Sequence, residues 1–204
     1  MRVNKISIAI LFSLGCFLSA CSVKTPPTTQ YKLDAYNSKR VHSKPSPVSI
    51  LVSQPDAVGG YQTEQMLYMT KPYELSSFVK NAWVSPPASM LFPLITQSLQ
   101  DSGYFYAVVS PPYGDKATYR LDTQLIELQQ NFIVKPSRIE LVLKVVLTQV
   151  ESDQIIASRI IHQQAICPLD TPYGGVIAAN MAVKSFTSIV RDFVINHIQH
   201  DKRG

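Results

Sequence analysis

The sequence predicts an α+β fold, a two-layer sandwich in which a mainly antiparallel sheet carries helices packed on one face. Two observations favour it. Strand-like segments bounded by turn residues follow one another along most of the chain. One segment of helical periodicity lies among them, and a second one closes the chain.

The first 20 residues have the layout of a signal peptide. A positively charged start precedes an apolar run from Ile6 to Leu18, shorter than the roughly 20 apolar residues of a membrane span. The run ends in Leu-Ser-Ala-Cys at Cys21, which resembles the bacterial lipobox. The resemblance implies that Cys21 is acylated and begins the mature chain. The alternatives are a plain signal peptide, with Cys21 incidental, and an uncleaved anchor.

Residues 21–46 are expected to be the lipidated N-terminus and a flexible tether. They are rich in Pro, Ser, Thr and Lys, and only the stretch 31–36 could form a short strand. Residues 22–47 hold five basic residues and one acidic residue. This charge could favour anionic head groups or simply keep a linker soluble. From Val48 onward acidic residues slightly outnumber basic ones, which argues against nucleic acid as a partner.

Residues 47–200 are expected to fold as one domain. With Cys16 in the leader and Cys21 acylated, only Cys167 remains, so no internal disulfide can form and the core alone must stabilise the fold. The domain opens with two predicted strands, 47–55 and 61–71, on either side of the Gly59-Gly60 turn.

A helix is predicted between Ser85 and Gly103. Ser85 can cap it, Pro86 and Pro87 suit its first turn, and an apolar stripe at helical spacing follows. Pro93 removes one backbone hydrogen bond and should kink the helix or delay its start.

The remaining elements alternate strongly. Segment 117–132 changes phase near Ile126, which predicts a bulge. The apolar positions of 138–150 line one face, and 154–166 should return as its hairpin partner. From Val176 to His197, apolar residues recur every three or four positions, which predicts a long amphipathic helix. Segment 104–110 is a further predicted strand.

No catalytic or metal-binding pattern stands out. The chain lacks the common nucleophile, phosphate-loop and zinc motifs, so we expect neither an enzyme nor a metal or other cofactor. His197 and His200, three positions apart near the end of the last helix, suit a surface or end-capping role better than a metal site. Cys167 is expected to be a small buried side chain.

The stretch 73–91 is the best candidate for partner binding. It contains the only tryptophan, Trp83, beside Tyr73, Pro86 and Pro87, and exposed aromatic residues are typical binding anchors. The alternative is that Trp83 plugs the end of the core.

The same stretch resembles the ABC-type transport auxiliary lipoprotein family, the PqiC-like lipoproteins. The resemblance rests on Gly60-Tyr61, Tyr73-Glu74-Leu75, Asn81-Ala82-Trp83 and Pro86-Pro87-x-x-Met-Leu, in this order. It implies a non-catalytic accessory of an ABC transporter and of a mammalian-cell-entry (MCE) tunnel protein that moves lipid between membranes.

The resemblance also implies a place in the cell. Ser22 after the acylated cysteine looks like the sorting signal for the outer membrane, where the protein would face the periplasm and contact the membrane through its lipid. A homo-oligomer is possible. The alternative is a lipoprotein chaperone or a structural subunit of an outer-membrane β-barrel or secretion assembly. An envelope hydrolase is a third hypothesis, which the lack of a nucleophile motif disfavours.

Overall fold

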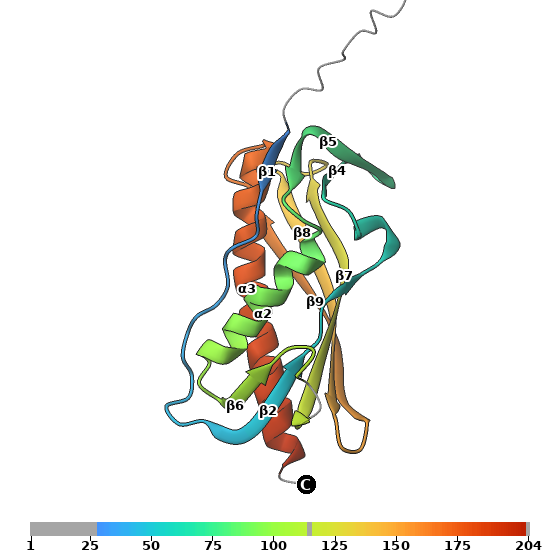
Figure 1. Cartoon of the computed structure of the whole chain (residues 1–204). Helices are drawn as coiled ribbons and strands as arrows, with labels where there is room; N and C mark the ends of the chain where they lie inside the picture. Colours follow the sequence, from blue (N-terminus) through green and yellow to red (C-terminus); the bar gives the residue numbers. More distant parts are fainter. Residues whose placement is uncertain (1–27, 114–115, 203–204) are drawn as a thin grey trace, which may run out of the picture.

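The computed structural model describes residues 28–113 and 116–202, and these form a nine-stranded sheet and two long helices (Figure 1). The leader, Cys21 and Ser22 lie outside the described residues. The strands are β1 (Thr29–Tyr31), β2 (Ser46–Val52), β3 (Asp56–Ala57), β4 (Gln65–Lys71), β5 (Glu74–Trp83), β6 (Phe105–Val109), β7 (Tyr119–Asn131), β8 (Arg138–Gln149) and β9 (Gln154–Ile166). The helices are the short η1 (Gly59–Tyr61), α2 (Pro87–Asp101) and α3 (Pro172–Asp201). Within the described part, no helix combines the length and apolar character needed to cross a bilayer.

Strand β7 organises the sheet. Along one edge it pairs antiparallel with β8, which pairs antiparallel with β9. Along its other edge it pairs in parallel with β2, β3 and β4 in turn. β4 and β5 form an antiparallel hairpin, and β1 and β6 add parallel to β5 and β2. The sheet is therefore mixed, and the expectation of a mainly antiparallel sheet describes only the β7–β8–β9 part and the hairpin.

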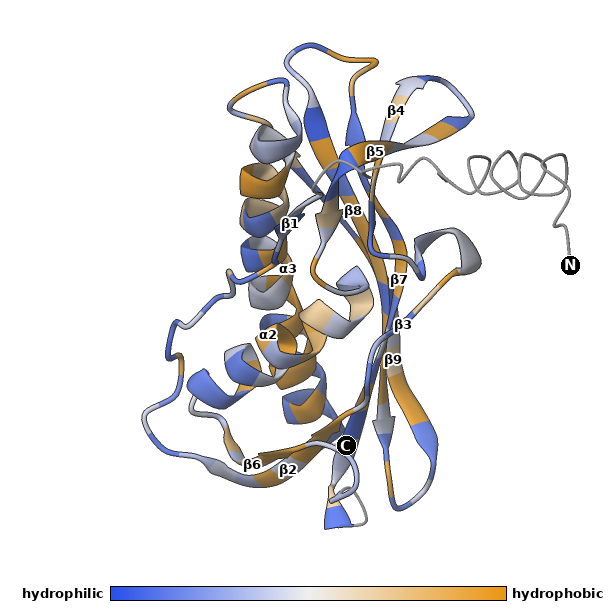
Figure 2. Ribbon diagram, turned by 45° about the horizontal axis from the view of Figure 1, so that its top comes forward, coloured by the Kyte–Doolittle hydropathy of each residue, from blue (hydrophilic) through white to orange (hydrophobic). Residues whose placement is uncertain are grey.

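The core lies between the sheet and the two helices, which cover the same face of the sheet (Figure 1). Figure 2 shows hydrophobic and hydrophilic positions alternating along β8 and along α3. The alternate residues Leu141, Leu143 and Val145 of β8 are fully buried, as are Val183 and Phe186 of α3. Full burial of such side chains contributes about 1.5–3 kcal/mol each.

Several predicted elements are confirmed. The register of β7 shifts between Leu125 and Glu127, where the change of phase predicted a bulge. α2 ends before Gly103, whose φ of 72° suits glycine. The cap of α2 differs, because Pro86 occupies that position and makes no side-chain capping bond. α3 starts earlier than the pattern from Val176 suggested, because Thr171 accepts a hydrogen bond from the nitrogen of Gly174.

Residues 32–45, which we call the strap, run along the helical layer from β1 to β2. They belong to the segment expected to be a flexible tether, yet they are bound to the domain. The backbone nitrogens of Asp34 and Ala35 donate to the side-chain oxygen of Asn180, at 2.8 and 3.1 Å. Farther along, the backbone nitrogen of Val41 donates to the carbonyl of Ser102 at 3.0 Å. The side chain of Asn180 in α3 and the backbone at the end of α2 thus supply the hydrogen-bond partners that an extended segment lacks.

Candidate functional site

The β4–β5 hairpin projects from the body of the molecule and carries Tyr73 at its tip (Figure 1). Lys71 pairs with Glu74 across a turn formed by Pro72 and Tyr73, and Tyr73 has a φ of 66°. This position of a tight turn normally holds glycine or asparagine, because other side chains are strained there. The Tyr73 side chain is fully exposed. The turn therefore presents a bulky ring to solvent at a cost in backbone strain, a combination found at functional sites.

Two aliphatic side chains extend this exposed surface along β5. Leu75 is 44% exposed and Val79 is 86% exposed. Both lie on the strand that leads away from the turn. We call Tyr73, Leu75 and Val79 the hairpin surface. Only Tyr73 was singled out from the sequence, although the Pro72-Tyr73 turn between two strands was a signal for the whole hairpin.

An aromatic cluster fixes the hairpin to the body. The ring of Tyr68 lies 4.4 Å from that of Phe78 and 5.9 Å from that of Phe132, the residue after β7. Such pairs are worth about 0.5–1.5 kcal/mol beyond the area they bury. The projecting strands are thus held in one direction.

Trp83 and the two prolines lie elsewhere. Trp83 ends β5, is 3% exposed and belongs to the hydrophobic core. Its backbone nitrogen donates to the carbonyl of Glu64 at 2.7 Å. Ten residues of strand, about 33 Å, separate it from Tyr73. A buried ring cannot anchor a partner, so the geometry favours the alternative in which Trp83 completes the core.

Pro86 and Pro87 start α2. Pro87 is buried, and Pro86 is partly exposed. Their role is to begin the helix, where a missing N–H costs nothing. The four residues expected to bind a partner therefore do not meet, and only Tyr73 stands on an open surface.

A pair of carboxylates lies on the sheet face opposite the helices. Glu127 of β7 and Glu140 of β8 are near each other, and Gln129 donates from Nε2 to Glu140 at 3.3 Å. Burial, and then the neighbouring Glu140 carboxylate, raise the pKa of Glu127 to about 7. Burial also raises the pKa of Tyr61 to about 12, and its hydroxyl donates to Gln129 at 2.7 Å. The Glu127 carboxylate can therefore take up a proton near neutral pH.

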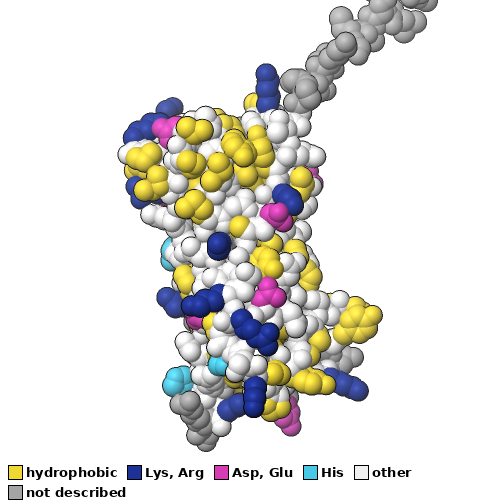
Figure 3. Space-filling model, turned by 90° about the vertical axis from the view of Figure 1, so that its left-hand side faces the viewer, with side chains coloured by type: hydrophobic (Ala, Val, Ile, Leu, Met, Phe, Trp, Pro, Cys, Tyr) yellow, Lys and Arg dark blue, Asp and Glu magenta, His cyan; other side chains and the backbone are white. Residues whose placement is uncertain are grey.

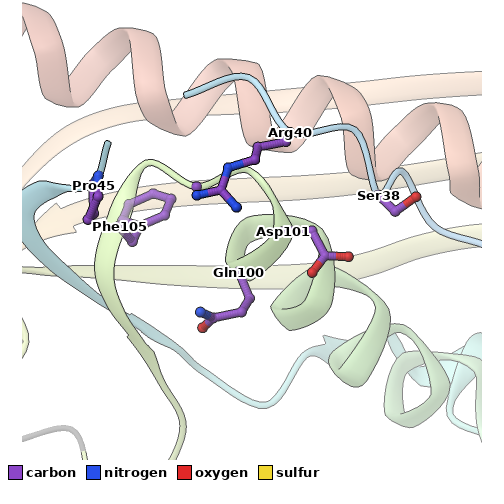
Figure 4. A pocket seen from close by; sticks show the side chains of 7 residues that line it. Ser38, Arg40, Pro45, Gln100, Asp101 and Phe105 are labelled. Carbon is purple, nitrogen blue, oxygen red and sulfur yellow. The ribbon is translucent and has the colours of Figure 1, made fainter. Parts of the chain in front are cut away.

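A hollow near the helices lies between the strap and the end of α2 (Figure 4). Its volume is about 500 Å³. Arg40 reaches it from the strap, and Asp101 and Gln100 reach it from α2 (Figure 4). Arg40 also donates to the carbonyl of His42 at 3.0 Å. The hollow offers one cation and one carboxylate to a polar ligand.

The other potentially reactive side chains considered from the sequence have structural surroundings. Within residues 28–113 and 116–202, no three potential metal ligands form a group. Cys167 is buried, and burial raises the pKa of its thiol, so it is poorly suited to act as a nucleophile. Nδ1 of His197 lies 2.8 Å from the carbonyl of Phe193 in the same helix.

Comparisons with known proteins agree with this architecture. A family model described as "ABC-type transport auxiliary lipoprotein component" matches residues 31–189. No curated protein matches the chain.

Solved structures show the same fold. The crystal structure of protein XCC0632 from Xanthomonas campestris matches with a TM-score of 0.79 and 17% sequence identity, covering 87% of this chain and all of that one. The crystal structure of an uncharacterized protein matches with a TM-score of 0.66 and 15% identity, covering 82% of this chain and 99% of that one. At this level of identity the likeness concerns the fold alone.

Proposed function

The chain belongs to the family of ABC-type transport auxiliary lipoprotein components, and from that premise we propose that it is a non-catalytic docking subunit of a lipid-transport system. In this proposal, acylated Cys21 holds the domain at the outer membrane, facing the periplasm, and Ser22 provides the sorting signal. The partner is the MCE-type tunnel protein that works with the ABC transporter.

The hairpin surface carries the proposal. A docking subunit needs a rigid, exposed apolar surface, and aromatic residues are enriched at the energetic centres of such surfaces. Tyr73 provides a fully exposed ring, with Leu75 and Val79 beside it on β5. The aromatic cluster of Tyr68, Phe78 and Phe132 holds this surface in place before any partner arrives, which lowers the entropic cost of binding.

The sharpest test replaces Tyr73 with glycine. Tyr73→Gly removes the ring but keeps a turn with a φ of 66°, which glycine adopts without strain. The variant should therefore unfold at the same urea concentration as the parent, or at a higher one. Affinity purification from detergent-solubilised envelopes should recover the MCE-type partner with the parent and several-fold less with the variant.

Tyr106→Ala is the matched control. Tyr106 is a tyrosine of β6, away from the hairpin, with 78% of its surface exposed. Its loss should leave recovery of the partner unchanged. Equal recovery with Tyr73→Gly and the parent would contradict the docking role of the hairpin surface. Recovery of an outer-membrane β-barrel or secretion assembly in place of transport proteins would favour the chaperone or structural-subunit alternative.

A further inference from the structure

A second exposed apolar surface covers the end of the molecule that carries β1. Figure 3 shows hydrophobic side chains gathered on this upper end, and Figure 1 places β1 and the start of α3 there. We define the end patch as Tyr31, Val84, Leu169 and Tyr173. Leu169 is 59% exposed, Tyr173 55% and Val84 47%, while Tyr31 is partly exposed. A patch built from three separate segments needs an explanation.

Contacts link the segments that carry these residues. The rings of Tyr31 and Tyr173 are 5.9 Å apart, and the nitrogen of Val84 donates to the carbonyl of Tyr31 at 2.8 Å. Leu169 lies against the first turn of α3, because a Cβ on Gly174 would fall 2.0 Å from the Leu169 carbonyl oxygen. The patch is therefore a fixed surface.

The loop that presents Leu169 is also pinned from its other side. Asp170 accepts hydrogen bonds from Lys135 Nζ at 2.9 Å and from the backbone nitrogen of Ser137 at 2.7 Å. These partners lower the pKa of Asp170 to about 2, so the carboxylate stays charged and bound. Lys135 consequently stands at the rim of the patch, with 66% of its side chain exposed.

The end patch lies close to the point of membrane attachment. β1 begins at Thr29, eight positions after Cys21. Eight extended residues span at most about 28 Å. If Cys21 carries the anchor, β1 cannot be farther than this from the bilayer surface.

We propose that the end patch rests on the lipid surface, with its apolar side chains at the boundary between head groups and acyl chains. The inference relies on the anchor at Cys21 in the proposed function and adds an orientation to it. Tyrosine suits this boundary because its ring is apolar and its hydroxyl is polar. Lys135 Nζ is bound to Asp170 at 2.9 Å, so the two opposite charges form a paired polar border beside the patch.

A contact of the end patch with lipid would fix the orientation of the whole domain relative to the membrane. α3 has 30 residues, about 45 Å of helix, and runs from Tyr173 in the patch to Asp201. The hydroxyl of Tyr119 donates to Asp201 at 2.6 Å, and Tyr119 pairs with Gln149, so the β8–β9 turn lies at the far end. The domain then stands upright on the membrane with that turn farthest from it.

The experiment measures how close each end lies to lipid. The full acylated chain is reconstituted into phosphatidylethanolamine/phosphatidylglycerol vesicles that contain doxyl-labelled lipid. An environment-sensitive fluorophore is attached in the variant Leu169→Cys, and separately in Ile155→Cys. Ile155, near the β8–β9 turn, is 64% exposed and thus matches Leu169. The unsubstituted chain, whose Cys167 is buried, sets the background of labelling.

The expected result is several-fold stronger quenching and a blue-shifted emission at position 169, with no quenching at position 155. Adding Tyr173→Ser to the Leu169→Cys chain should weaken the quenching while the chain still floats with the vesicles. Equal quenching at both positions, or none at position 169 in a chain that floats, overturns the inference alone. A chain that does not float overturns the anchor and the inference together. No transport partner is present, so these outcomes are independent of the hairpin surface.

Discussion

The guanidinium of Arg191 in α3 donates a hydrogen bond to the side-chain oxygen of Asn37 in the strap, 2.7 Å away. The same group donates to the carbonyl of Lys39 at 3.3 Å, and only 4% of the Arg191 side chain is exposed. A buried cation thus fastens the N-terminal segment to the last helix, more than 150 positions later in the chain.

Arg191→Met should loosen the strap. It removes the Arg191 donor from the Lys39 carbonyl and from the Asn37 side-chain oxygen, which then keeps only the backbone nitrogen of Lys39 at 3.0 Å. We expect a loss of about 2–3 kcal/mol in the free energy of unfolding in urea. Asp192→Asn is the control, because the Asp192 carboxylate is 54% exposed and such pairs contribute about 1 kcal/mol or less. If both variants unfold like the parent, the Arg191 hydrogen bonds to the strap do not contribute to stability.

Trp83→Ala should lower the free energy of unfolding by about 3–5 kcal/mol, because it opens a cavity in the core. Trp83→Phe should cost clearly less, since most of the buried volume remains. Chemical denaturation measures both, and the parent should show the blue-shifted tryptophan emission of a buried indole. Emission typical of exposed tryptophan, or an alanine variant of unchanged stability, would contradict the burial of this ring.

Glu127 should make stability depend on pH. Its folded pKa of about 7 lies above the ordinary value of 4.5, so the folded state binds the proton more tightly than the unfolded state. The resulting stabilisation is complete below about pH 4.5 and is lost as the pH rises through 7. Allowing for solvent screening, we expect a decrease of about 1–2 kcal/mol between pH 5 and 8.

The variant Glu127→Gln carries no titrating group at this position, so the decrease should be smaller than in the parent. Unfolding in urea at several pH values compares the two chains. Parallel pH profiles for parent and variant would show that the Glu127 carboxylate does not titrate in this range.

Cys21→Ser should release the domain from membranes without changing its unfolding transition, because the substitution removes the expected acylation site. Fractionation of cells followed by detection of the domain in each fraction measures the effect. Cys167→Ser, which alters the other cysteine of the expected mature chain, should remain with the membranes. A Cys21→Ser chain that stays membrane-bound would contradict acylation at this position.

The sequence predicted the strands and helices that have one buried apolar face and one exposed polar face. Strand β8 alternates because Leu141, Leu143 and Val145 face the helices while Glu140 and Lys144 face away, and that alternation is visible without a structure. α3 is visible for the same reason, since one stripe of it is buried. The antiparallel return of β9 followed from the short turn after β8.

The elements that were missed carry no such pattern. β5 projects from the body, so most of its side chains are exposed or half-buried and no alternation marks it. The strap is polar because its backbone is satisfied by α3, through residues such as Asn180 that are distant in sequence. The parallel pairs of β7 depend on crossovers that no local pattern reveals. The candidate site is the hairpin surface and not the whole stretch 73–91, because tertiary packing buries Trp83 and no local pattern reveals that burial.

The strap has a mechanical consequence. Its hydrogen bonds to α3 follow one another lengthwise, from Asp34 at Asn180 to Asn37 at Arg191. Tension applied at the N-terminus pulls along that line from the β1 end, so the bonds are loaded in shear together and are not peeled apart singly. Bonds loaded together in shear resist force better than bonds that open one at a time, so tension on the N-terminal segment would be passed to α3 before the strap detaches.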